Sequence, residues 1–119
     1  MRNLVAVLMF AAGLTAMPAH AEDITGTKLA EYCASPYDSF LHGACGGYIL
    51  GVSDTMNYYH LNYYDKECIP STATRGQVIK VIMRYLDDKP EKLHRHAHFL
   101  IVNALIEGFD CNDGLSYPL

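Results

Sequence analysis

The sequence predicts an all-α fold, a small single-domain bundle of about four helices stapled by two disulfides. Apolar residues recur at steps of three and four along most of the chain, which is the helical period rather than the alternation of a strand. The chain has 119 residues, and so small a domain buries a limited share of its surface and gains from covalent links. Its cysteines, even in number, suit a disulfide framework and are Cys33, Cys45, Cys68 and Cys111.

The first 21 residues have the pattern of a secretory signal peptide. Arg2 precedes an uncharged, mostly apolar run over residues 4–16, and alanines follow at 19 and 21, the positions that a signal peptidase reads. The run is too short for a membrane-spanning helix, which needs about 20 residues. We therefore expect cleavage after Ala21, a periplasmic location and a mature domain comprising residues 22–119.

The charge balance is acidic, with a formal net charge of −4 when the histidines are neutral. Nucleic-acid binding requires a basic face, and the charges are not clustered along this chain. The composition therefore gives no support to a nucleic-acid partner, and a cationic partner would be easier to hold.

A short helix is expected first, within residues 22–34. Thr25 or Thr27 can cap it, because a side-chain oxygen at that position accepts a hydrogen bond from an unpaired amide of the first turn. Ser35-Pro36 ends it, since proline disfavours helix in the residue before it.

The central element is a long helix that begins near Phe40 and runs into a tyrosine-rich segment before Cys68. Asp38 or Ser39 can cap its start. The spacing of its apolar and small residues predicts a stripe that faces the core, made of Leu41, Cys45, Tyr48, Val52, Met56, Tyr59 and Tyr63.

Three glycines fall at four-residue steps inside this helix: Gly43, Gly47 and Gly51. Each costs a solvated helix about 1 kcal/mol relative to alanine. We expect the gain that offsets this cost to be the close approach of another backbone, either within the domain or across a homodimer interface. Similar spacing marks transmembrane helix pairs, but the polar residues Asp54, Asn57 and His60 exclude a bilayer here.

A third helix is expected from Arg75 to about Leu86. Thr74 and Gln77 have the arrangement of a capping box, in which each side chain satisfies an amide of the other residue. The apolar positions that follow at helical spacing are Val78, Val81, Ile82, Tyr85 and Leu86.

A fourth helix is expected to carry Pro90 in its first turn, where a missing amide hydrogen costs nothing, and to end at Gly108. Because the connection over residues 87–91 is short, the third and fourth helices should pack antiparallel. Residues 112–119 are expected to be a loose tail. The buried stripe of the fourth helix is predicted to be Leu93, Ala97, Leu100, Ile101, Ala104 and Leu105.

Helix lengths favour one pairing of the cysteines. Cys45 lies near the start of the central helix, about 27 Å from its end at 1.5 Å per residue, whereas Cys68 follows that end closely. If successive helices run up, down and up, the end of the fourth returns Cys111 to the level of Cys68. We therefore expect the pairs Cys33–Cys45 and Cys68–Cys111.

Two candidate reactive groupings have simpler interpretations. Glu91, His94 and His98 could share one helix face as zinc ligands, but a polar face near a helix start accounts for them. Cys45 beside His42 or His60 could be a nucleophile and its base, but a disulfide is the expected state of Cys45. We predict no catalytic residue, metal or cofactor.

Two groups of side chains are candidate contacts for a protein partner. Tyrosine offers a large apolar area with a polar tip and is enriched at binding hot spots. One helix cannot bury two adjacent pairs, so we expect two of these four to pack and the others to be exposed: Tyr58, Tyr59, Tyr63 and Tyr64. The acidic turn at Asp87 and Asp88 is the second candidate.

The chain also carries a series of landmarks whose order and spacing resemble those of the Rap/Tai family, the periplasmic immunity proteins of bacterial type VI secretion systems. The resemblance covers the chain from Cys33 onward. The residues that carry it are Cys45, Gly47, Tyr48, Ile49, Gly51, Val52, Asp54, Cys68, Ile69, Pro70, Thr74, Gln77, Val78, Tyr85, Leu86, Pro90, Glu91, His94, Ala97, Ala104, Leu105, Phe109 and Cys111.

The resemblance implies an all-helical domain, often dimeric, that binds a secreted peptidoglycan amidase in the periplasm and blocks its catalytic cleft. Such an inhibitor is not an enzyme and needs only a rigid surface, because rigidity limits the entropy lost on binding. The alternative is a small periplasmic stress chaperone of the HdeA-like kind or another small periplasmic binding protein without a toxin partner. In a chaperone, histidines and carboxylates would titrate in acid and loosen the fold.

Overall fold

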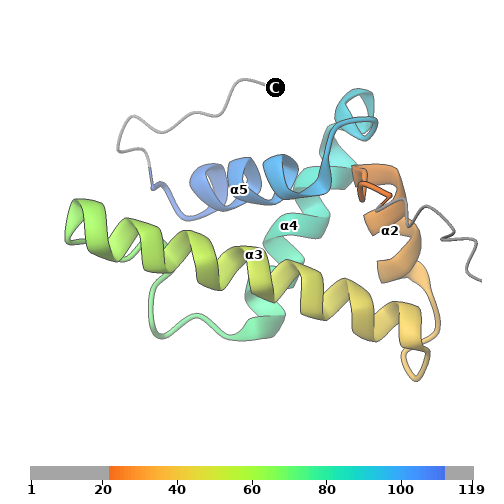
Figure 1. Ribbon diagram of the computed structural model, residues 1–119, viewed down its shortest axis with the longest axis horizontal. Coiled ribbons are helices and arrows are strands. Elements are labelled where there is room, and N and C mark those ends of the chain that lie inside the picture. The colour runs from red at the N-terminus through yellow and green to blue at the C-terminus, as the bar shows by residue number, and fades with distance from the viewer. Residues whose placement is uncertain (1–21, 112–119) are drawn as a thin grey trace, which may run out of the picture.

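The computed structural model describes residues 22–111. Within that range the chain forms α-helices and one short 3-10 helix, with no strand, which confirms the all-α prediction (Figure 1). The predicted signal peptide, its cleavage site and the tail over 112–119 lie outside the described residues. The elements are α2 (Gly26–Ala34), α3 (Phe40–Tyr64), α4 (Arg75–Asp88), η1 (Pro90–Lys92) and α5 (Ala97–Gly108). None of the helices between residues 22 and 111 has the length and hydropathy to cross a membrane.

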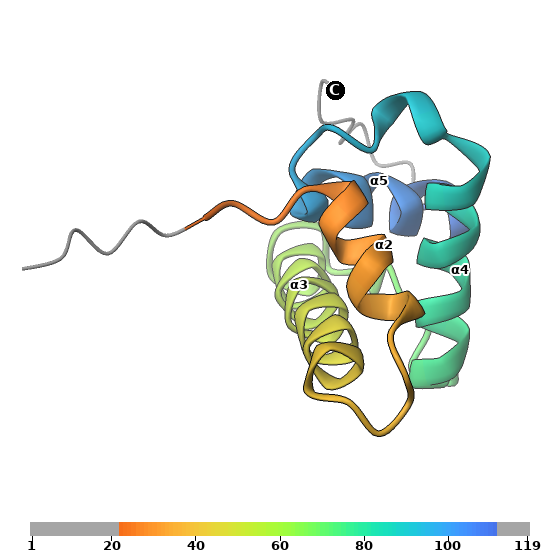
Figure 2. The same ribbon diagram turned by 90° about the vertical axis from the view of Figure 1, so that its right-hand side faces the viewer.

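The long helix α3 forms one side of the bundle, and α5 lies along it with the same chain direction (Figure 1). Figure 2 shows α2 between α3 and α4. The core fills the space among these helices. Its fully buried large apolar side chains are Leu29, Ile49, Ile82, Leu86, Leu100, Ile101 and Leu105.

Side-chain caps fix where three helices begin. The hydroxyl oxygen of Thr25 accepts from the Lys28 amide at 3.3 Å, and that of Ser39 accepts from the His42 amide at 3.2 Å. Thr74 caps α4 with the predicted capping box, in which Gln77 Oε1 accepts from the Thr74 amide at 2.7 Å. Of the alternatives open from sequence, the structure selects Thr25 and Ser39.

The fourth helix begins at Ala97 and not near Pro90, so its predicted start was wrong. Pro90 opens the 3-10 helix η1 instead. The intervening backbone pairs with the N-terminal segment: the Leu93 carbonyl accepts from the Thr27 amide at 2.9 Å and the Arg95 carbonyl from the Gly26 amide at 2.9 Å. The Ala97 amide likewise donates to the Ile24 carbonyl at 2.7 Å instead of to a carbonyl one turn back, so the backbone before Ala97 pairs across the chain and α5 starts only there.

Two glycines outside the predicted stripe allow helices to pack closely. A Cβ on Gly26 would overlap Cδ1 of Leu100 and would lie 3.0 Å from the Leu93 carbonyl oxygen. At the other end of α5, a Cβ on Gly108 would overlap Cγ1 of Val81. These are the close approaches that only glycine permits.

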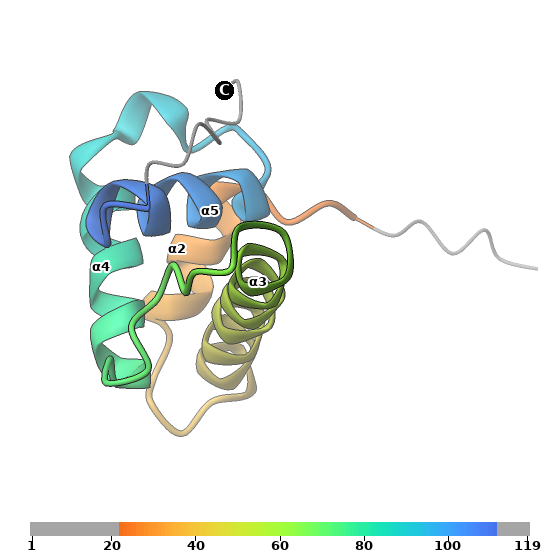
Figure 3. The same ribbon diagram turned by 90° about the vertical axis from the view of Figure 1, so that its left-hand side faces the viewer.

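The predicted antiparallel packing of the last two helices was also wrong, because α4 runs across α5 (Figures 1 and 3). Gly108, at the end of α5, meets Val81 in the middle of α4. An antiparallel pair would have placed it near the start of α4. The connection over η1 turns the chain far enough for the two axes to cross.

Both disulfides have the predicted pairing, Cys33–Cys45 and Cys68–Cys111, and each joins Cα atoms 5.1 Å apart. The argument from helix lengths holds because α3 and α5 run in the same direction. Their ends therefore lie on one side of the domain, where Cys68 and Cys111 meet.

The buried face of α3 differs from the predicted stripe. Only Cys45 and Met56 are shared, and the predicted Leu41, Tyr59 and Tyr63 are exposed. Apolar residues surround this helix, so their spacing does not single out one face. The residues that α3 buries are Cys45, Ile49, Ser53, Met56 and His60.

Candidate functional site

The described residues offer little reactive chemistry. Glu91 lies in η1, His94 in the following turn and His98 in α5, so the helix break separates the three candidate zinc ligands. No group of three or more histidine, cysteine or acidic residues between 22 and 111 is placed to hold a metal ion. Cys45 is bonded to Cys33 and therefore has no thiolate to act as a nucleophile.

The surface of α3 is unusually apolar. Every large hydrophobic side chain exposed in the described domain lies on α3 or in the loop just before it. Among the 25 residues of α3, Asp54 is the only aspartate, glutamate, lysine or arginine. A helix that is apolar on all sides normally lies inside a protein, so this surface has the composition of an interface. Its exposed large side chains are Tyr37, Phe40, Leu41, Tyr58, Tyr59, Leu61, Tyr63 and Tyr64.

The tyrosine cluster, defined as Tyr58, Tyr59, Tyr63 and Tyr64, forms the C-terminal end of that surface. Tyr59 stacks on Tyr63 with ring centroids 4.3 Å apart and meets the edge of Tyr64 at 6.4 Å. The expectation that two of the four would be packed is not met, because even Tyr59 and Tyr64 remain 40% and 39% exposed. All four rings are open to a partner.

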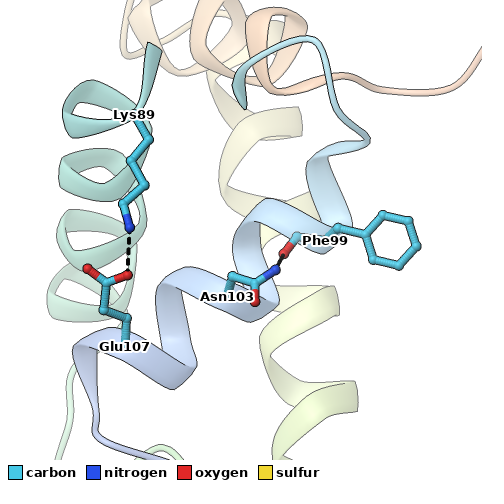
Figure 4. A network of polar contacts seen from close by, with 4 residues as sticks. All are labelled: Lys89, Phe99, Asn103 and Glu107. Atoms are coloured by element: carbon cyan, nitrogen blue, oxygen red, sulfur yellow. Dashed lines mark hydrogen bonds and ion pairs between the residues drawn. The ribbon is translucent and has the colours of Figure 1, made fainter. Parts of the chain in front are cut away.

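A groove between α3 and α5 adjoins the tyrosine cluster. This α3–α5 groove has a volume of about 640 Å³. Figure 4 shows Phe99, one of its walls, projecting from α5 on the side away from Glu107. The lining is mainly apolar, and it comprises Gly47, Tyr48, Gly51, Val52, Thr55, Met56, Tyr59, His60, His98, Phe99 and Val102. Burial raises the pKa of the Tyr48 phenol.

The glycine stripe of α3 faces open space. A Cβ placed on Gly43, Gly47 or Gly51 would meet no neighbouring atom within 4 Å. The expectation that the stripe packs against another backbone within the domain was therefore wrong for the part of the chain that the structure describes. The second alternative, an interface between two copies, stays a prediction.

The acidic turn lies at the far end of the molecule from the tyrosine cluster. Asp87 and Asp88 are exposed in the last turn of α4. Figure 1 shows that end of α4 beside α2, whereas the C-terminal end of α3 lies at the opposite side of the view. The structure therefore does not bring the two predicted contact groups into one patch.

The residue after the acidic turn ties α4 to α5. Lys89 Nζ lies 2.8 Å from Glu107 Oε2 (Figure 4) and 4.6 Å from the centroid of the Tyr85 ring. The hydrogen bond to Glu107 raises the pKa of Lys89. Burial raises the pKa of Tyr85, and the nearby ammonium partly offsets that shift.

Sequence reasoning missed the N-terminal end of the apolar surface. Tyr37 and Phe40 are 89% and 87% exposed, more than any member of the tyrosine cluster. They flank the Ser39 cap, so the start of α3 holds them outside the bundle. Aromatic residues on both sides of a helix cap were the signal that could have identified them.

Comparison with known proteins identifies a relationship at the level of the family. A family model described as Rap1a immunity proteins matches residues 25–111. No curated protein and no solved structure matches the chain.

Proposed function

We propose that this chain, which belongs to the family of Rap1a immunity proteins, inhibits a secreted peptidoglycan amidase in the periplasm. An immunity protein acts against a secreted effector, so its partner is a protein. The amidase is chosen because the landmarks of this chain resemble the Rap/Tai family. Inhibition would follow if the domain covers the catalytic cleft of the amidase.

The observation that carries the proposal is the apolar surface of α3. Exposed aromatic side chains lose water when a partner covers them, and tyrosine is among the residues that dominate binding energy at interfaces. We assign the effector contact to the tyrosine cluster, whose stacked rings lose little further freedom on binding. Asp87 and Asp88 are proposed as a second, separate contact.

The two disulfides support the proposed location. Such bonds persist in oxidising compartments, of which the bacterial periplasm is one. All four cysteines between residues 22 and 111 are paired. The amidase would act on the cell wall in that same compartment.

The glycine stripe is proposed as the interface of a homodimer. Without side chains at Gly43, Gly47 and Gly51, a second helix can approach the backbone closely. An interface between identical copies also brings like charges together, and Asp54 is the single aspartate, glutamate, lysine or arginine of α3. The face therefore suits a second copy of an acidic chain.

A protection assay tests the proposed effector. Cells that export a candidate amidase to the periplasm should lyse, and co-expression of this chain should prevent lysis. Amidases encoded beside the gene are the first candidates. Failure to protect against them, together with no complex in pull-down, would reject the amidase.

Matched variants test the proposed contact. Tyr58→Ala combined with Tyr63→Ala removes the two most exposed members of the tyrosine cluster and should abolish protection. Tyr37→Ala removes a still more exposed tyrosine, in the loop before the other end of α3, and should leave protection intact. If both variants protect cells equally well, the effector does not contact the tyrosine cluster.

A further inference from the structure

Basic residues gather on α4 although the chain as a whole is acidic. Between Glu67 and Asp87 the sequence contains no acidic residue, whereas Arg75, Lys80 and Arg84 all lie there. All three are exposed on α4. Lys80 and Arg84, which line one hollow, therefore form a small cationic face ahead of the acidic turn, and the net charge of −4 conceals it.

A hollow of about 570 Å³ lies on this face and is here termed the α4 groove. One side comes from the loop before α4 and the other from the turn after α5. Lys80 and Arg84 lie one helical turn apart along it. The residues that line it are Pro70, Thr72, Ala73, Gln77, Lys80, Val81, Arg84 and Phe109.

The two cations of the α4 groove form no ion pair within residues 22–111, although the acidic turn lies one helical turn beyond Arg84. Lys28 and Lys89 each pair with a carboxylate at 2.7 and 2.8 Å. Lys80 and Arg84, by contrast, form no ion pair or side-chain hydrogen bond with any residue from 22 to 111. Their charges are available to a ligand.

The polar lining consists mainly of hydrogen-bond donors. Gln77 uses its amide oxygen to accept from the Thr74 backbone, which leaves its amide N–H groups for another acceptor. No carboxylate lines the hollow. Glu67, close by in sequence, accepts from the Ser71 amide at 3.2 Å. A carboxylate is the acceptor that matches such a set, especially opposite a guanidinium.

Apolar side chains complete the α4 groove. Val81 and Phe109 lie beside the cations, so the site suits a ligand that is acidic and apolar at once. The disulfide between Cys68 and Cys111 holds the two flanking segments together, because Pro70 and Phe109 each lie two residues from a bonded cysteine. A site fixed in this way loses little conformational entropy on binding.

We propose that the α4 groove binds an acidic segment of the effector protein, with a carboxylate between Lys80 and Arg84 and an apolar side chain against Phe109. The proposal rests on the immunity function proposed above. It favours a peptide segment over an anionic membrane, because the cations border a hollow with apolar walls. A second copy would offer through α3 only the carboxylate of Asp54.

Peptide titration tests this site without the effector. The probe is an acetylated and amidated hexapeptide, Gly-Glu-Leu-Glu-Phe-Gly, added to the ¹⁵N-labelled mature chain at about 0.15 M salt, where charges beyond about 8 Å are screened. Amide shifts should concentrate at Lys80, Arg84 and Phe109. The counterpart with glutamine for glutamate should bind at least tenfold more weakly.

Variants separate the α4 groove from general electrostatics. Lys80→Gln with Arg84→Gln should weaken peptide binding at least tenfold. Lys92→Gln with Arg95→Gln removes the same charge outside the groove and should change binding less than twofold. Equal losses from the two pairs, shifts spread over the surface, or equal binding of the glutamine peptide would overturn the proposal.

The protection assay then distinguishes this proposal from the function on which it rests. If Lys80→Gln with Arg84→Gln protects cells as well as the unchanged chain, the α4 groove does not bind the effector, although immunity stands. Anionic vesicles are a further probe. Binding to vesicles of phosphatidylglycerol that exceeds binding to the peptide would assign the groove to a membrane surface and overturn the proposal.

Discussion

Helices α3 and α4 belong to one small domain, but their exposed surfaces differ in chemistry. The surface of α3 is apolar, nearly uncharged and open along its glycine stripe. By contrast, α4 has a capping box, a clear buried side and an outer face with Arg75, Lys80 and Arg84. Both helices cover the same core, so the core does not explain why their outer faces differ.

The difference between the outer faces of α3 and α4 indicates where binding partners contact the domain. A helix that only completes a core needs one apolar stripe and a polar exterior, and α4 meets that requirement except for its unpaired cations. α3, by contrast, has more exposed aromatic residues than a helix needs when its only role is to complete the core. We interpret the excess on α3 and the unpaired charge on α4 as two surfaces made for partners of different chemistry.

The largest expected effect comes from the disulfide that supports the α4 side. Cys68→Ser with Cys111→Ser releases a link between residues 43 apart and should lower the free energy of unfolding by about 4 kcal/mol in the chain-entropy model. Denaturant unfolding measures it. The same variant should weaken peptide binding to the α4 groove.

The disulfide at the start of α3 provides the comparison. Cys33→Ser with Cys45→Ser opens a separation of 12 residues and should cost about 3 kcal/mol without weakening peptide binding to the folded chain. If removing either disulfide lowers the free energy of unfolding by less than about 1 kcal/mol, helix packing alone stabilises that part of the domain.

The next largest effect on stability is expected at Gly26, where close packing requires a glycine. Gly26→Ala places a methyl group against Leu100 and the Leu93 backbone and should destabilise the domain by about 1–3 kcal/mol, the usual cost of overpacking. Gly76→Ala, in the first turn of α4, is the control because its nearest neighbour, Thr74 Oγ1, would lie 3.9 Å away. Thermal unfolding of the two variants measures the difference, and equal melting temperatures would contradict it.

These glycines show what sequence could and could not predict. Repetition at Gly43, Gly47 and Gly51 suggested close packing, yet those positions are open. Gly26 and Gly108 are isolated in sequence, and their neighbours come from distant parts of the chain. Spacing reports on one helix, whereas close approach depends on how helices cross.

The same distinction, between local signals and contacts with distant residues, separates the helix starts that were predicted correctly from the one that was not. Local signals located α4 and the start of α3, because a cap and its amide are neighbours in sequence. The start of α5 depended on hydrogen bonds between residues 24–27 and 93–97, which no local pattern reveals. The disulfide pairing was predictable because helix length limits where each cysteine can reach.

The candidate contacts were only partly predictable. The tyrosine cluster could be named from composition, since four tyrosines in adjacent pairs exceed what one buried stripe can hold. The α4 groove could not, because Phe109 and Pro70 join it from distant parts of the chain. Net charge even pointed to a cationic partner, whereas Lys80 and Arg84 give the groove itself a local positive charge.

A smaller effect of opposite sign should come from the open glycine stripe. Gly47→Ala meets no atom within 4 Å and should stabilise the monomer by up to about 1 kcal/mol through helix propensity. The added methyl group should at the same time weaken self-association at α3. Denaturant unfolding and sedimentation equilibrium measure the two effects.

Gly46→Ala is the matched control for that experiment. Its Cβ also meets nothing within 4 Å, but Gly46 lies outside the stripe, so it should stabilise the monomer without affecting self-association. If the two variants associate equally well, the stripe is not the interface, and α3 loses part of its contrast with α4.

The smallest effect tests the acidic turn that ends α4. A carboxylate in the last turn of a helix opposes the helix dipole at a cost of about 0.3–1 kcal/mol, so Asp88→Asn should stabilise the domain by that amount. Asp38→Asn, before the first turn of α3, removes a charge that the dipole favours and should have the opposite sign. High salt should reduce both changes in the free energy of unfolding.

If Asp88→Asn stabilises the fold and yet reduces protection against the effector, the carboxylate of Asp88 contributes to binding at a cost to the stability of α4. If protection is unchanged, the acidic turn is only a solvated end and the effector contact lies elsewhere.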